Sequence, residues 1–199
     1  MPWWTDRVLP RIIDKALDTK EIPPLRERTC QGLRGDVVEI GFGSGLNIPH
    51  YPAAVRSVNA VEPSDVAWRL ARKRLDASST PVRRSGLDGE RLDLPDESFD
   101  AVYLPLIVTV APDGQRILAE AARVAKPGVR LVVLDRFWPE GRPRPAAVRR
   151  AGALLGSLAM HIDRRFSEIH AGAPDLRVLD DETLAPGGFL QLITLEKSS

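Results

Sequence analysis

The stretch that decides the fold is residues 37–47, which read VVEIGFGSGLN. A short β-branched run leads directly into three glycines at alternate positions, Gly41, Gly43 and Gly45. In an open α/β sheet, ligands bind in the crevice beyond the carboxyl ends of the strands, and glycines there let a ligand approach the backbone. The stretch therefore predicts a buried strand followed by a ligand-binding loop.

The order of apolar runs around this stretch predicts an α/β fold. Four more short runs are typical of buried parallel strands. They occupy residues 58–61, 81–83, 99–104 and 131–134. Helical spacing of apolar residues follows Pro63, where Ser64 or Asp65 is placed to cap a helix, and it recurs after Asp113.

The C-terminal part of the chain breaks this alternation. Two further runs, residues 176–179 and 189–193, are separated by too few residues for a crossover helix, so we expect an antiparallel pair. The sequence thus predicts a single domain with a Rossmann-like, seven-stranded and mostly parallel sheet.

Composition excludes several classes of protein. The 199 residues carry 28 Lys and Arg against 27 Asp and Glu, and this balance removes a global attraction to nucleic acid. One cysteine and three histidines fit a reducing compartment and predict no metal site. The longest nearly apolar run, residues 102–111, is too short to span a bilayer. We expect a cytoplasmic protein, either free or peripheral at the inner membrane face.

Acidic residues near the strand ends indicate the kind of ligand. Glu39 lies on a strand otherwise built of Val and Ile, where a buried carboxylate needs a cationic or hydrogen-bonding partner. Glu62 ends the second strand, where a carboxylate can accept both ribose hydroxyls, and Asp88 follows the third strand. Three acidic groups without a lysine favour a positively charged nucleoside that has no phosphate. A nicotinamide enzyme is the alternative, although Leu46 occupies the third glycine position of its motif.

Four motifs in order carry a resemblance to a known family. They are EIGFGSG at residues 39–45, VEP at 61–63, LPDESFD at 94–100 and RVAKPG at 123–128. The chain resembles the class I methyltransferases that use S-adenosylmethionine, particularly those of quinone biosynthesis and the phospholipid N-methyltransferases. The likeness covers about residues 34 to 137, and the segment 46–52 resembles the lipid subgroup. Val129 departs from the pattern, because many relatives have a glycine there, and a positive φ would strain a valine.

The resemblance implies S-adenosylmethionine as the cofactor and a set of residues that hold it. The three glycines of the loop would wrap its methionine moiety, Glu62 would take the ribose hydroxyls, Asp88 and Gly89 would bind adenine, and Leu104 would face the cofactor. The complete predicted set is Glu39, Gly41, Gly43, Gly45, Asn47, Glu62, Pro63, Asp88, Gly89 and Leu104.

The remaining segments are predicted to form the acceptor site. We divide the chain into an N-terminal helical lid (1–30), a cofactor-binding core (31–137), a helical insertion over the acceptor (138–172) and a C-terminal strand pair (173–199). The lid begins with an amphipathic helix that ends near Pro23. The arginine-rich segment 136–150 is either a phosphate contact or a solvated loop.

Methyl transfer needs an acceptor aligned with the sulfonium methyl group, and a general base is optional. His50, Tyr51 and His161 are the candidate proton acceptors, whereas Asp135 at the end of the fifth strand is expected only to pair with an arginine. A phosphatidylethanolamine-type amine is the first predicted acceptor, and a quinone or secondary metabolite is the second. A module that binds the cofactor without catalysis is the remaining alternative.

Overall fold

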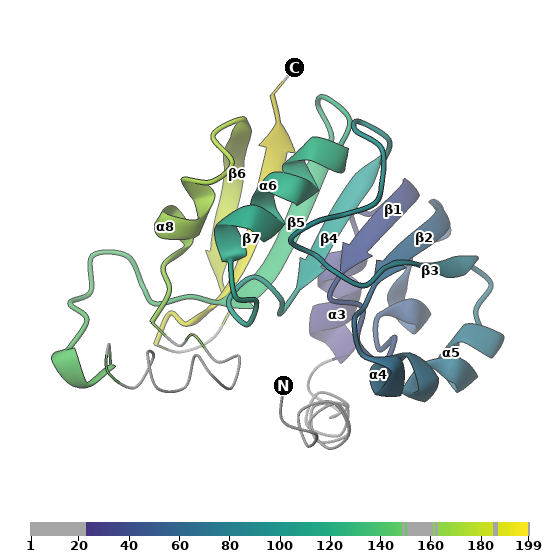
Figure 1. The fold of residues 1–199 in the computed structure, drawn as a ribbon, viewed down its shortest axis with the longest axis horizontal. Coiled ribbons are helices and arrows are strands. Elements are labelled where there is room, and N and C mark those ends of the chain that lie inside the picture. The colour runs from purple at the N-terminus through teal and green to yellow at the C-terminus, as the bar shows by residue number, and fades with distance from the viewer. Residues whose placement is uncertain (1–22, 149, 151–160, 162, 185–186, 199) are drawn as a thin grey trace.

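The computed structural model describes residues 23–148, 150, 161, 163–184 and 187–198. Its centre is a seven-stranded sheet in the order β3-β2-β1-β4-β5-β7-β6 (Figure 1). The strands are β1 (Gly35–Ile40), β2 (Val55–Val61), β3 (Val82–Gly86), β4 (Ala101–Pro105), β5 (Arg130–Arg136), β6 (Leu176–Thr183) and β7 (Leu190–Lys197). All seven predicted strands are present.

The first five strands are parallel, and the last two pair antiparallel, as predicted. Strand β7 lies between β5 and β6 and runs antiparallel to both. The spatial order of the strands reverses where β1 lies beside β4. Ligands of open α/β sheets bind at such a reversal, so the fold places the crevice at the carboxyl ends of β1 and β4.

Helices cover both faces of the sheet. Figure 1 shows α6 (Gly114–Val124) in front of the sheet and α3 (Pro23–Cys30) behind it. The remaining elements are η1 (Ile48–His50), α4 (Asp65–Leu70), α5 (Arg72–Asp76) and α8 (Phe166–His170). Alternate residues of a strand point to opposite faces. On β1, Val38 and Ile40 therefore join the core under α6, whereas Val37 joins the core under α3.

The two predicted core helices begin at polar side chains. The Ser64 hydroxyl accepts a hydrogen bond from Ala67 N (3.2 Å) at the start of α4, and the Asp113 carboxylate accepts one from Arg116 N (3.1 Å) at the start of α6. Such caps satisfy backbone amides that have no partner inside the helix. The predicted strain at Val129 is absent, because the left-handed residue of that turn is Gly128 (φ 71°).

Two predicted regions cannot be compared in full. The amphipathic N-terminal helix, and residues 149, 151–160 and 162 of the helical insertion, lie outside the described residues. In the part of the chain that is described, no helix combines the length and the apolar character needed to cross a membrane.

Candidate active site

The glycine loop follows β1 at the predicted crevice. Gly41, Gly43 and Gly45 all have positive φ values, of 85°, 60° and 73°. A β carbon added to Gly41 would lie 2.7 Å from Ile107 Cβ, whereas one added to Gly43 would meet no atom within 4 Å. Gly41 is therefore required for packing, and Gly43 leaves open space in which a ligand can approach the backbone.

Glu62 ends β2 and reaches the glycine loop. Its Oε2 accepts a hydrogen bond from Gly43 N (2.7 Å), and its Oε1 accepts one from Ser64 N (2.7 Å). Burial raises the pKa of Glu62, and the two amides and Arg84 oppose that rise. A carboxylate has about four lone-pair positions, so each oxygen can still accept a hydroxyl group. The structure thus brings Gly43 and Glu62 together.

The segment after β3 lies at the same end of the parallel strands. Asp88 is exposed, and its Oδ1 accepts a hydrogen bond from Glu90 N (2.9 Å). Gly89 packs on the core, since a β carbon there would lie 2.8 Å from both Ile117 and Ile40. Leu87 was not among the predicted site residues, yet its side chain is 60% exposed. An exposed leucine beside a carboxylate offers an apolar surface to a flat ring.

Two other predicted cofactor residues differ in their surroundings. Pro63 is exposed at the tip of β2. The side chain of Leu104 is fully buried in the core beneath α6, so the structure does not bring it to the surface beside the glycine loop. Leu106, two residues later, has a φ of 55°, which marks a sharp turn of the backbone after β4.

Glu39 is fully buried and belongs to a network of side chains. Asn47 Nδ2 donates to its Oε1 (2.7 Å), and the Tyr51 hydroxyl donates to its Oε2 (2.5 Å). Arg26 Nη1 donates to Asn47 Oδ1 (2.5 Å). Burial raises the pKa of Glu39 to about 7, although these hydrogen bonds and the Arg26 charge oppose the rise. Arg26 was not predicted as part of the site, because an arginine on a surface helix ordinarily faces solvent.

The candidate proton acceptors are not equivalent. The Tyr51 hydroxyl donates a hydrogen bond to Glu39, and burial and that carboxylate hold the pKa of Tyr51 well above its usual value, so its hydroxyl keeps its proton and is not available as a base. His50 lines a hollow of about 610 Å³ together with Glu27 and Gln31. Burial and the Arg26 charge lower the pKa of His50, so its imidazole is neutral and can accept a proton. Burial also lowers the pKa of His161, which is partly buried.

Asp135 anchors the loop that follows β4. Its Oδ1 accepts from the Thr109 hydroxyl (2.6 Å) and from Arg136 N (2.7 Å), and its Oδ2 accepts from Thr109 N (2.9 Å). Arg164 holds the same loop from outside, donating to Ala111 O and Pro112 O at 2.6 Å each. The expected pairing of Asp135 with an arginine side chain is therefore replaced by hydrogen bonds to Thr109 and to the backbone.

The arginine-rich segment contributes partly to internal structure. Arg144 forms an ion pair with Glu168, and Arg142 donates to Gly187 O (3.1 Å) and lies over the Phe189 ring. Two of the five arginines in segment 136–150, from which a phosphate contact was predicted, therefore contact other parts of the chain.

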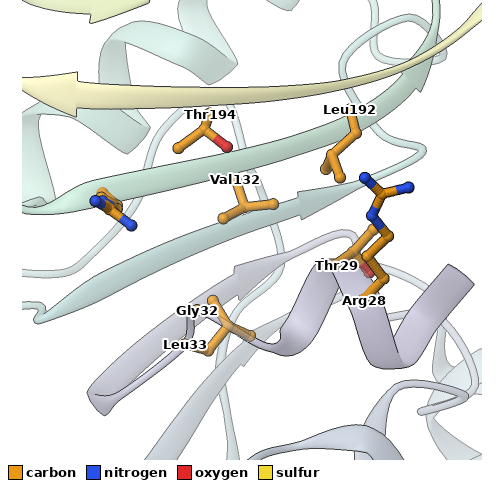
Figure 2. A pocket seen from close by; sticks show the side chains of 8 residues that line it. Arg28, Thr29, Gly32, Leu33, Val132, Leu192 and Thr194 are labelled. Carbon is orange, nitrogen blue, oxygen red and sulfur yellow. The ribbon is translucent and has the colours of Figure 1, made fainter. Parts of the chain in front are cut away.

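A second hollow lies between the region of α3 and strands β5 and β7. Figure 2 shows Thr29 and Leu33 of the α3 region facing Val132, Leu192 and Thr194 of β5 and β7. Its volume is about 90 Å³. Ligand pockets typically measure roughly 300–1,000 Å³, so this gap is too small for a nucleoside. Among the described residues, no three His, Cys, Asp or Glu side chains gather where they could hold a metal ion.

The fold and the comparisons with known proteins define the class. Residues 38–133 match the family model described as a methyltransferase domain. Together with the sheet order and the glycine loop, this match supports a class I S-adenosylmethionine-dependent methyltransferase. It favours this class over the nicotinamide alternative.

Two of the similar proteins are named as methyltransferases of phosphatidylethanolamine and of demethylmenaquinone. A phosphatidylethanolamine N-methyltransferase of Cereibacter sphaeroides is 29% identical over 165 residues, which cover 82% of this chain and 80% of that protein. A demethylmenaquinone methyltransferase of Tropheryma whipplei (strain Twist) is 31% identical over 104 residues, 52% of this chain and 43% of that protein. These names support the small-molecule and lipid type.

A solved structure supports the same fold. The S-adenosylmethionine-dependent methyltransferase of Mesorhizobium loti superposes with a TM-score of 0.67 at 16% identity, covering 90% of this chain and 99% of that one. At this identity the likeness shows the fold alone.

Proposed function

We propose that the chain methylates the amine of a lipid-like acceptor of the phosphatidylethanolamine type. The observation that carries the proposed cofactor site is the 2.7 Å hydrogen bond between Gly43 N and the Glu62 carboxylate, which joins the open backbone of the loop to an acceptor of hydroxyl groups. The amine is supported by the phosphatidylethanolamine N-methyltransferase of C. sphaeroides, which is similar over most of both chains.

The residues present fit S-adenosylmethionine. Gly43 leaves the space that a β carbon would fill, Glu62 keeps lone pairs for ribose hydroxyls, and Leu87 with Asp88 offers an apolar surface and an acceptor for adenine. When bound, the cofactor supplies a methyl group that its sulfonium already makes electrophilic. The protein's residues then have to orient the acceptor and exclude water.

We propose that His50 accepts the proton that the acceptor amine has to lose. An alkylammonium group has to lose a proton before its nitrogen can attack, and the lowered pKa of His50 keeps the imidazole neutral at neutral pH. Glu27 and Arg28 line the hollow beside His50, and they provide one negative and one positive side chain for a zwitterionic headgroup. In this proposal, residues 1–30 and 138–172 form the walls of the acceptor site.

A quinone acceptor is the second candidate. The demethylmenaquinone methyltransferase of T. whipplei supports it, with a match that spans less than half of that protein. A quinol and an ethanolamine headgroup differ in charge, so a direct comparison of acceptors separates the two candidates.

Incubation with methyl-labelled S-adenosylmethionine tests the proposal. We expect label in phosphatidylethanolamine, a lower rate for His50→Gln, and an unchanged rate for His170→Gln, because the His170 ring hydrogen-bonds Leu176 O and stacks on Phe166, away from His50 in the chain. Label in demethylmenaquinol alone would favour the quinone. Cofactor binding without any labelled acceptor would favour the module without catalysis.

A further inference from the structure

The connection between β1 and β2 lacks the helix that a parallel crossover usually contains. Residues 41–54 form the glycine loop, the single 3₁₀ turn η1 and a short segment leading to β2. A helix after a glycine loop normally fixes that loop through its first backbone amides. Here another structure must hold the loop, and η1 packs between α3 and α5.

The side chains of Arg26, Glu39, Asn47 and Tyr51, which we name the Glu39 cluster, occupy this place. Both carboxylate oxygens of Glu39 accept hydrogen bonds from residues that follow the loop, Asn47 (2.7 Å) and Tyr51 (2.5 Å). Asn47 is itself held by Arg26 of α3 (2.5 Å). Glu39, Asn47 and Arg26 are all at most 7% exposed. The cluster therefore ties the end of β1 to both the far side of the loop and α3.

The arrangement leaves little of Glu39 for a ligand. Its side chain is fully buried, and it lies on the same face of β1 as Val37, which packs in the core under α3. A charged group costs several kcal/mol to bury, and such groups persist where they fix one geometry. The role predicted for Glu39 was direct contact with the cofactor, but a side chain that is fully buried between Asn47, Tyr51 and α3 favours an indirect role.

We infer that Glu39 is a positioning residue, which acts on the cofactor site only through Asn47 and Tyr51 by fixing the glycine loop. The inference rests on the proposed cofactor site for its binding readout. Helix α3 takes part in fixing the loop, because Arg26 sets the orientation of the Asn47 amide. Loss of any one member should loosen the loop and weaken binding of the cofactor.

A double-mutant cycle distinguishes positioning from direct contact. Dissociation constants for S-adenosylhomocysteine are measured by calorimetry for the wild type, Glu39→Gln, Tyr51→Phe and the double variant. We expect each single change to weaken binding about tenfold, the equivalent of one buried hydrogen bond. In the Tyr51→Phe background, Glu39→Gln should raise the dissociation constant by less than about a further twofold, because the effects of interacting residues do not add. Equal costs in both backgrounds would overturn the inference.

The matched control is Tyr103→Phe. Tyr103 is a fully buried tyrosine under the same face of the sheet, and its hydroxyl lies 2.8 Å from the Thr29 hydroxyl, outside the Glu39 cluster. This variant should bind S-adenosylhomocysteine as the wild type does. An equal loss of affinity in Tyr103→Phe would show a general loss of structure and would contradict a specific role.

Hydrogen exchange of the cofactor-free protein gives a readout that does not need binding. The amides of Gly45 and Ile48 are bonded within the loop, to Phe42 O and Gly45 O at 3.2 Å each. They should exchange faster in Tyr51→Phe than in Tyr103→Phe, and Asn47→Ala provides a second variant if Tyr51→Phe does not fold. Unchanged exchange would overturn the inference. Absence of binding by the wild type would contradict the proposed function and leave the exchange result to decide on Glu39.

Discussion

The carboxylate of Glu62 accepts hydrogen bonds from two backbone amides, Gly43 N and Ser64 N. One bond fixes the glycine loop, and the other fixes the start of α4. The spare lone pairs on the same oxygens point to a second use of this carboxylate. A single side chain at the tip of β2 thus fixes two backbone segments of the crevice, and in the proposed function the same carboxylate also accepts the ribose hydroxyls.

Substitution of Glu62 tests this double role. Glu62→Ala should weaken binding of S-adenosylhomocysteine by on the order of 1 to 3 kcal/mol, because charge-assisted hydrogen bonds to the ribose are lost. Asp88→Ala is the comparison within the same proposed site, since that carboxylate is exposed and accepts a hydrogen bond from Glu90 N. Its effect should be smaller. Calorimetry that finds equal affinities for the wild type and Glu62→Ala would remove Glu62 from the site.

Single residues also show where the sequence suffices. Glu39, Glu62 and the three glycines could be singled out because their chemistry is unusual for a strand end. The partners of Glu39 could not be predicted, since Arg26 lies 13 positions before it in the chain and nothing in the local pattern turns that side chain inward. Leu104 was predicted from the resemblance to the family. Its side chain is buried in the core under α6, because it points to the opposite face of β4 from Tyr103, which packs in the core under α3.

At the scale of elements, hydrophobic pattern predicted every strand, while helix α3 did not stand out. Buried parallel strands need continuous apolar runs, so their positions are visible in the sequence. Helix α3 begins at Pro23, where the N-terminal helix was expected to end, and proline is favoured in a first helical turn. Its inner face includes Arg26, Thr29 and Cys30, which gives no clear apolar stripe.

The loop after β4 depends on elements that are distant in sequence. Asp135 of β5 holds Thr109 from one side, and Arg164 donates to carbonyls of residues 108, 109, 111 and 112 from the other. Because removal of the guanidinium deletes these hydrogen bonds, the loop should become more mobile. This loop follows the carboxyl end of β4 and therefore borders the crevice.

Arg164→Met should loosen this loop. We expect a loss of roughly 1 to 3 kcal/mol in the free energy of unfolding from the lost hydrogen bonds, together with faster exchange of the Ala111 amide, which is bonded to Ile107 O. Arg165→Met is the matched control, because Arg165 donates to Arg142 O (2.6 Å) and not to the loop. If both variants exchange alike at Ala111, the anchoring role of Arg164 is wrong.

For the whole molecule, buried and exposed carboxyl groups make opposite contributions to the dependence of stability on pH. Burial raises the pKa of Glu39 to about 7 and raises those of Glu62 and Asp135. Arg56 and Ser57 lower the pKa of Asp36 through hydrogen bonds. A raised pKa means that the folded state holds a proton that the unfolded state has lost, so this contribution is full at low pH and disappears as pH rises.

The Glu39→Gln variant isolates the largest of these effects. Between the ordinary pKa of 4.5 and about 7, the wild type should lose up to roughly 3 kcal/mol of unfolding free energy through Glu39. Denaturant unfolding at a series of pH values should therefore show a falling curve for the wild type and a flatter one for Glu39→Gln across this interval. Asp36→Asn should instead remove stability that is present above about pH 4 and lost in stronger acid, because the pKa of Asp36 is lowered. Parallel curves for the wild type and Glu39→Gln between pH 4.5 and 7 would mean that Glu39 is ionised in the folded protein, held by Asn47, Tyr51 and the charge of Arg26.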